Sequence, residues 1–314
     1  MTAPTVRDDD LAVLSTACTW AQAGYAVALA TVITTWGSAP RREGSHLAVR
    51  VDGLFAGSVS GGCVEADVIL AAQDLLAADA GHAVLEYGVA DTVAWTAGLA
   101  CGGRITILVQ RLAADALPLA LLEGVLATTA AGQMAAISSD PATGRIVEGV
   151  DGPFVRKYPP PRRLFIIGAV HIAQALVPLA GGLGIATTVI DPRGLFAADE
   201  RFAGLELDRR WPDEALAGAL NAASAVVALT HDPKIDDVAL ACALRSPAHY
   251  IAALGSRKNH AGRLERLAEQ GFGQQDLARI HGPAGLAIGA VGPAEIALSI
   301  AAQMTAAWRN AHTA

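Results

Sequence analysis

The second half of the chain alternates short apolar runs with longer segments of helical periodicity, and this pattern constrains the fold more than any other feature. The apolar runs are residues 164–167, 185–190, 225–230 and 250–254. Strands that alternate with helices build βαβ units, whose strands lie parallel in one sheet. The sequence therefore predicts an α/β protein with a C-terminal Rossmann-like domain over residues 164–314.

A triple proline separates this domain from the first half of the chain. Residues 159–161 are all proline, and cationic side chains lie on both sides of them. Such a segment is extended and cannot enter a helix. We therefore expect a linker at residues 156–163, preceded by an N-terminal α+β domain at residues 1–155.

The first half of the chain mixes strands and helices without regular alternation. Strands are expected at residues 26–35, 46–51, 54–59, 82–87 and 104–110, further extended segments at 134–140 and 145–150, and helices at 11–24, after Cys63 and at 117–130. The dipeptide Asp52-Gly53 is a strong signal for a tight turn, so the second and third strands are expected to form a hairpin.

Composition excludes several classes of protein. Hydrophobic residues make up 53% of the chain and charged residues 17%, which is enough apolar surface for a packed core and argues against disorder. The formal net charge is -7 and the sequence has no basic run. Neither a nucleic acid nor an anionic membrane surface is therefore an expected partner.

No membrane span or signal peptide is expected. The apolar stretch 285–304 is interrupted by Pro293 and Glu295, whereas a spanning helix needs about 20 apolar residues with few charges. The N-terminus is acidic and lacks the basic-then-apolar pattern of a signal peptide. The 4 cysteines do not make a disulfide scaffold. We expect a cytoplasmic protein with reduced thiols.

A glycine follows the first apolar run of the C-terminal half. Residues 168–173 lie where a dinucleotide-binding domain has the fingerprint G-x-G-x-x-G/A. Gly168 matches the first glycine, but Val170 occupies the position of the second. The Val170 side chain is expected to obstruct the pyrophosphate there. Asp191 follows the next apolar run, at the place where an acidic residue of such a domain normally accepts a hydrogen bond from a ribose hydroxyl. Arg193 lies beside it. The alternative is that Gly168 only makes a turn and Asp191 only caps a loop.

Two later strand ends also carry polar residues. His231 follows the third run, and Ser256 and Arg257 follow the fourth at the start of a helix. Ligands of open α/β sheets lie outside the carboxyl ends of the strands, and a helix start attracts anions. We expect Asp191, His231 and Arg257 to converge on one crevice that binds an anionic group. Ordinary capping of exposed loops is the alternative.

Two segments of the first half combine glycines with a cysteine. Their residues are Ser60, Gly61, Gly62 and Cys63 at a helix start, and Cys101, Gly102 and Gly103 before a strand. Paired glycines form a concavity whose N–H groups face an anion, and a helix start lowers the pKa of a cysteine, which favours the thiolate that binds metals. The alternative is that a small cysteine beside glycine only packs tightly.

The loop at residues 36–45 is the densest polar loop of this half. It carries Arg41 and Arg42 amid flexible residues. Two adjacent guanidinium groups are suited to hold a phosphate or a carboxylate. A solvated turn is the alternative interpretation.

Several stretches of the chain, in order, resemble the XdhC/CoxI family of xanthine dehydrogenase accessory proteins. They are GSAPRREG, GSVSGGCVE, ACGG, IIGAVHIAQAL, VIDPR, LTHD, ALGSRK and IGAVGPAEIALSIAAQM. The resemblance covers both halves of the chain. Its most specific pieces are SGGCVE and IGAVGPAEIALSIAA, since neither is a general Rossmann feature.

The resemblance implies a chaperone that carries the molybdenum cofactor (molybdopterin) as cargo. Such a protein protects the cofactor while its terminal sulfido ligand is installed, with a cysteine desulfurase as a partner, and delivers it to a molybdenum hydroxylase apoenzyme of the xanthine dehydrogenase type. If the resemblance extends to the site residues, Cys63 and Cys101 would be metal ligands at the metal-bearing end of the cofactor. The crevice of the C-terminal half would hold the pterin phosphate or a nucleotide; its carried-over residues are Asp191, Arg193, Ser256 and Arg257.

Other functions are compatible with the same residues. One is an NAD(P)-dependent oxidoreductase, against which Val170 argues because the family's usual Gly-Ala-Gly-His is Gly-Ala-Val-His here. Another is a cysteine-based sulfur-transfer protein that uses Cys63 or Cys101. The sequence has no obvious general base paired with a nucleophile, so rapid turnover is not expected. The alanine-rich stretch 294–307 suggests a homodimer contact.

Overall fold

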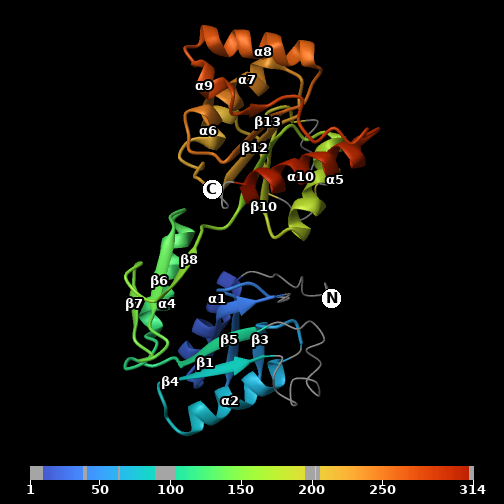
Figure 1. Ribbon diagram of the computed structural model, residues 1–314. Helices are drawn as coiled ribbons and strands as arrows, with labels where there is room; N and C mark the ends of the chain where they lie inside the picture. Colours follow the sequence, from blue (N-terminus) through green and yellow to red (C-terminus); the bar gives the residue numbers. More distant parts are fainter. Residues whose placement is uncertain are drawn as a thin grey trace. The chain divides into compact units, whose positions relative to one another are not determined.

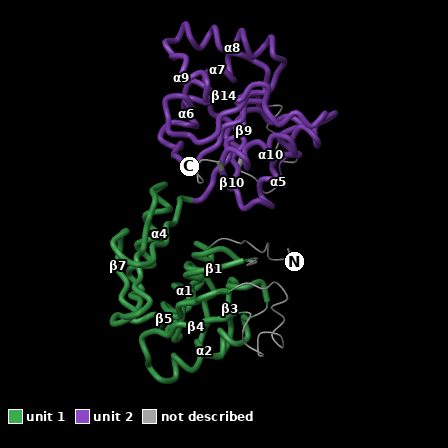
Figure 2. The backbone as a smooth tube through the Cα atoms, in the orientation of Figure 1, with its two compact units in different colours: residues 1–160 green, residues 161–314 purple. Residues whose placement is uncertain are grey.

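The computed structural model describes residues 10–37, 41–62, 64–88, 104–194, 202 and 206–310. The chain divides into two compact units, residues 1–160 and residues 161–314 (Figure 2).

The first unit is built on a five-stranded antiparallel sheet with the order β3-β2-β1-β5-β4 (Figure 1). Its strands are β1 (Val27–Trp36), β2 (His46–Arg50), β3 (Phe55–Gly57), β4 (His82–Tyr87) and β5 (Arg104–Arg111). The predicted hairpin is confirmed, because β2 pairs with β3 and Leu47 lies opposite Gly57. Gly53, in the turn between them, has the positive φ of +86° that favours glycine.

Both faces of this sheet are covered. On one face lies α2 (Glu65–Ala77), and on the other lie α1 (Asp10–Gln22), α4 (Leu119–Ala130) and a second sheet of order β7-β6-β8. The strands of this second sheet are β6 (Ala135–Ser139), β7 (Ile146–Glu148) and β8 (Phe154–Tyr158). Because successive side chains of β1 point to opposite covered faces, its first seven residues are all buried.

The segment between the units is shorter than the linker expected at residues 156–163. Strand β8 continues to Tyr158 and pairs with β6, and β9 already begins at Arg163. Tyr158 is buried in the core of the first unit. Only residues 159–162, the three prolines and one arginine, lie outside regular structure.

The second unit contains a six-stranded parallel sheet with the order β11-β10-β9-β12-β13-β14. Its strands are β9 (Arg163–Ile167), β10 (Ala186–Ile190), β11 (Glu206–Asp208), β12 (Ser224–Ala228), β13 (Tyr250–Ala253) and β14 (Ile280–His281). This is the 3-2-1-4-5-6 arrangement of a Rossmann fold, and the predicted fold class is confirmed. Strands β11 and β14 were not predicted, because two or three residues show no periodicity.

Helices cover both faces of the parallel sheet. One face is covered by α5 (His171–Gly182) and α10 (Pro293–Asn310), and the other by α6 (Pro212–Leu216), α7 (Pro233–Leu244), α8 (Arg257–Glu269) and α9 (Gln274–Leu277) (Figure 1). Within the described ranges, none of the helices has both the length and the apolar character that crossing a bilayer requires.

The alanine-rich helix α10 buries its apolar face within its own unit. Ala297, Ile300, Ala301 and Met304 belong to the same hydrophobic cluster as α5. These four residues are therefore buried within the same chain, whereas Leu298 of the same helix is 52% exposed, and a homodimer contact through the stretch 294–307 stays a prediction.

Candidate functional site

The polar strand ends of the second unit lie along the carboxyl edge of its sheet, since β10, β9, β12 and β13 are neighbours in that order. The first of them is the turn after β9. Gly168 has a φ of +113°, and a Cβ at this position would lie 2.8 Å from Cγ2 of Thr230 at the end of β12. Only glycine fits here without strain. Val170 has an ordinary φ of -98° and packs partly against the core, so its conformation does not require glycine.

Asp191, at the end of β10, is fully buried and hydrogen-bonded within the chain. Its carboxylate accepts a hydrogen bond from the backbone N–H of Ala169 at 2.8 Å. It also accepts three hydrogen bonds from Arg193, one from the backbone N–H and two from Nε and Nη2 of the side chain, each at 2.9 Å. Burial alone would raise the pKa of Asp191, but the hydrogen bonds from Arg193 and Ala169 outweigh it and lower that pKa. The carboxylate of Asp191, which was expected to bind a ribose hydroxyl, instead links the turn after β9 to Arg193 through hydrogen bonds.

The turn after β12 has a similar internal anion. The buried carboxylate of Asp236 on α7 accepts hydrogen bonds from the Thr230 N–H at 3.2 Å, from the Thr230 hydroxyl at 2.6 Å and from the His231 N–H at 3.0 Å. His231 has the unusual φ of +64°, and it is exposed. The Asp236 contacts therefore hold His231 in a conformation that most residues avoid.

At the end of β13, the start of α8 is exposed. The Ser256 hydroxyl caps the helix by accepting the Asn259 N–H at 3.2 Å. Arg257 has no hydrogen bond or ion pair within the part of the chain that the structure describes, and its guanidinium is exposed. Among the residues expected in the crevice, Arg257 combines exposure, a positive charge and a helix start, which together suit an anionic group.

The glycine turn of the first unit also binds an internal carboxylate. Four consecutive N–H groups, those of residues 59–62, donate to the carboxylate of Glu65 at 2.8–3.2 Å. The hydroxyls of Ser58 and Ser60 donate to it as well. The expected concavity for an anion exists, but the anion in it is the side chain of Glu65. These N–H groups therefore already have an acceptor in this structure, and binding of the cofactor by Ser60, Gly61 and Gly62 stays a prediction.

Glu65 is held firmly in its charged form. Its partial burial would raise the pKa, but the hydrogen bonds from the two serines and from the backbone outweigh this and lower the pKa to about 2. The sequence reasoning noted Glu65 only as part of the motif. A usable signal was its place three residues after Gly62, the spacing at which an acidic side chain reaches back to a free N–H.

The other predicted residues of the first unit have internal partners or lie outside the described ranges. Nη2 of Arg42 is 3.5 Å from Oδ2 of Asp10, which also pairs with Arg156. Arg41 is half-buried. The residues Cys63, Cys101, Gly102 and Gly103 lie outside the described residues. Within those residues, no group of three His, Cys, Asp or Glu side chains is arranged to hold a metal ion.

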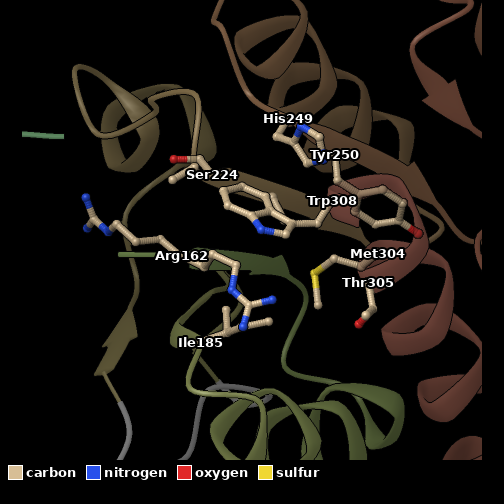
Figure 3. A pocket seen from close by; sticks show the side chains of 11 residues that line it. Arg162, Ile185, Ser224, His249, Tyr250, Met304, Thr305 and Trp308 are labelled. Carbon is tan, nitrogen blue, oxygen red and sulfur yellow. The ribbon is translucent and has the colours of Figure 1, made fainter. Parts of the chain in front are cut away.

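A narrow apolar pocket lies at the opposite, amino end of the strands of the second unit (Figure 3). Figure 3 shows the Trp308 ring of α10 between Arg162 and the pair His249 and Tyr250. The Trp308 and His249 rings meet edge to face, with centroids 4.9 Å apart. The pocket is therefore separate from the predicted crevice, and sequence reasoning did not find it.

The antiparallel α+β unit followed by a Rossmann unit defines a two-unit protein of mixed α/β class. Residues 164–304 match the XdhC Rossmann domain, and residues 20–88 match the XdhC and CoxI family. The chain belongs to the XdhC and CoxI family.

The chain is similar to relatives over almost its whole length. It is 28% identical over 308 residues to the molybdenum cofactor insertion chaperone PaoD of Escherichia coli, covering 95% of this chain and 89% of that protein. It is 27% identical over 312 residues to a probable xanthine dehydrogenase subunit from Bacillus subtilis, covering 88% of this chain and 91% of that protein. A crystal structure described as a xanthine dehydrogenase from Bacillus halodurans matches with a TM-score of 0.76 at 27% identity, covering 96% of both chains.

Proposed function

We propose that this protein is a chaperone that binds the molybdenum cofactor, protects it while its terminal sulfido ligand is installed, and delivers it to a molybdenum hydroxylase of the xanthine dehydrogenase type. The observation that carries the proposal is the similarity to a molybdenum cofactor insertion chaperone over 95% of this chain. The name of the Bacillus subtilis relative supports a client of the xanthine dehydrogenase type.

We assign the phosphate of the cofactor to the carboxyl edge of the Rossmann unit. Arg257 supplies an exposed guanidinium at the start of α8, and Arg193 is held at the same edge of the sheet by Asp191, with 30% of its side chain exposed. Guanidinium groups bind phosphate through charge-assisted hydrogen bonds. We assign the metal-bearing end to Cys63 and Cys101, because thiolates are soft ligands. In this proposal a cysteine desulfurase supplies the sulfur.

The direct test is anaerobic co-purification of the full chain from cells that make the cofactor. Bound pterin is measured by its fluorescence after oxidation, and molybdenum by elemental analysis. We expect both in a constant ratio. Purified protein without either would contradict the proposal. Saturable NAD(P)H binding with substrate-dependent reduction would instead indicate an oxidoreductase, and a stable persulfide after incubation with a cysteine desulfurase would indicate a sulfur carrier.

Replacing the glycine-flanked cysteines tests the metal-bearing end. We expect Cys63→Ala and Cys101→Ala each to lower the amount of co-purified molybdenum, because each change removes a soft ligand, while circular dichroism stays unchanged. The matched control is Cys242→Ala, which removes a half-buried thiol on α7 of the other unit. Equal molybdenum in Cys63→Ala and in the control would remove Cys63 from the site.

Replacing Arg257 tests the phosphate end. We expect Arg257→Ala to weaken cofactor binding by about 1.5–3 kcal/mol, the contribution of one charge-assisted hydrogen bond. The dissociation constant is measured by fluorescence titration under anaerobic conditions. Arg145→Ala removes an exposed arginine of the first unit and serves as the control for net charge. An unchanged dissociation constant for Arg257→Ala would show that the phosphate binds elsewhere.

A further inference from the structure

The carboxylate of Glu65 fills the turn formed by residues 58–62, which we call the 58–62 turn. Six donors surround it. They are the N–H groups of Val59, Ser60, Gly61 and Gly62 and the hydroxyls of Ser58 and Ser60. A backbone N–H has one hydrogen to donate, and in this turn each is already used. An anionic group of a ligand therefore cannot bind these N–H groups while Glu65 remains in place.

The 58–62 turn is anchored on one side and open on the other. Val59 is buried in the same hydrophobic cluster as Val68 of α2. Gly61 and Gly62 are exposed, both have positive φ, and a Cβ at Gly62 would meet no atom of the described residues within 4 Å. The exposed glycines therefore leave room for a bulky molecule to approach the backbone.

Glu65 couples the shape of the turn to the folding of α2. It is the first residue of that helix, so the helix fixes the position of its carboxylate. The carboxylate in turn accepts hydrogen bonds from four successive N–H groups, two of them from glycines, and only the Gly61 N–H among these four also donates to the Ser58 hydroxyl oxygen, at 2.9 Å. Holding a binding loop in one conformation before the ligand arrives lowers the entropic cost of binding.

We propose that Glu65 is a positioning residue for the cofactor: its carboxylate acts as an internal anion that holds the 58–62 turn in the shape that receives the cargo. This inference rests on the proposed function. It also implies that the turn, once freed of the Glu65 carboxylate, binds a small carboxylate such as acetate in its place, because the six donors remain.

The test compares the full chain with Glu65→Ala, Glu65→Asp and Asp67→Ala. Asp67 is the matched control because it is an exposed carboxylate in the same first turn of α2 and, among the described residues, makes no hydrogen bond to the 58–62 turn. Amide hydrogen exchange of the turn and co-purified cofactor are both measured. In Glu65→Ala we expect faster exchange and about tenfold less cofactor, the usual loss when a supporting group is removed. Asp67→Ala is expected to match the unmodified chain.

Added acetate separates positioning from simple damage. In Glu65→Ala, acetate is expected to slow exchange of the turn amides again and to restore part of the cofactor, and Glu65→Asp is expected to retain more cofactor than Glu65→Ala. Full cofactor retention in Glu65→Ala, or a loss that acetate does not reverse, would overturn the inference. If the unmodified chain carries no cofactor, the proposed function fails, and acetate-dependent exchange alone then decides whether Glu65 acts as the internal anion.

Discussion

Replacing Arg263 by methionine is expected to lower the free energy of unfolding of the second unit by about 3–5 kcal/mol, the usual cost of removing one partner from a buried ion pair. Arg263 is 4% exposed and shares the buried face of α8 with Leu267. Its Nη2 donates to the Leu254 carbonyl at 3.0 Å and lies 3.8 Å from Oδ2 of Asp236.

The expected loss arises mainly from the carboxylate that is left behind. Asp236 is 1% exposed, and burial outweighs its hydrogen bonds so that its pKa is raised. Without the guanidinium of Arg263, the charged form of Asp236 would remain in the interior beside the turn that it organises. Methionine fills a similar volume, so the change removes charge and hydrogen bonds with little new cavity.

Urea denaturation followed by pulsed hydrogen exchange measures this loss, because peptides from β12 and β13 report the second unit separately. Arg210→Met is the control, since Arg210 pairs with Asp208 in the same unit, 59% of the Arg210 side chain is exposed and its carboxylate partner is not fully buried. Its loss should be about 1 kcal/mol or less. The double variant Asp236→Asn, Arg263→Met should recover part of the stability. Equal losses in the two single variants would contradict a special role for the buried cation.

The architecture could be predicted because it depends on periodicity. The predicted strands at residues 82–87 and 250–254 lie within a residue of β4 and β13, since burial on one or both faces leaves a regular mark on the sequence. Strand β8 was missed because its cations and the prolines after Tyr158 are typical of a linker. Its pairing with β6 depends on a partner that local composition does not reveal.

The candidate site was predicted less completely, and the reason is common to three places. Sequence reasoning expected the N–H groups at Gly61 to face an anion and the strand ends that carry Gly168 and His231 to lie at a ligand site, but N–H groups of all three turns have acceptors within the chain. In the structure the acceptors are Glu65, Asp191 and Asp236. Which group accepts the hydrogen bonds of a turn depends on how the next helix or strand packs against that turn. The spacing of residues along the sequence does not specify this packing. Arg257 is exposed, as a ligand-binding cation needs to be, and no carboxylate of the described residues pairs with it.

Acidification from pH 7 to pH 4 is expected to lower the free energy of unfolding of the first unit by about 3 kcal/mol through His46 alone. His46 on β2 is 2% exposed, and its ring nitrogens lie 3.0 Å from the Thr31 hydroxyl and 2.9 Å from the Tyr158 hydroxyl. Burial, with a smaller contribution from the nearby charge of Arg156, lowers the pKa of His46 to about 3. The carboxylate of Asp10 pairs with Arg156 beside this group.

The direction follows from which state takes up the proton. In the unfolded chain a histidine has a pKa of about 6.5, so below that pH the unfolded state binds a proton that the folded state excludes until about pH 3. The contribution of neutral His46 is therefore complete above pH 6.5 and declines as the pH falls toward 3. His46→Gln removes this titration and leaves the carboxylates unchanged. The free energy of unfolding is measured by urea denaturation, with hydrogen exchange followed in peptides from β1 and β5. The difference in this free energy between the unmodified chain and His46→Gln should become about 3 kcal/mol less favourable to the unmodified chain between pH 7 and pH 4. A constant difference across this range would mean that the ring accepts its proton inside the fold, which the two hydroxyl contacts and the adjacent guanidinium oppose.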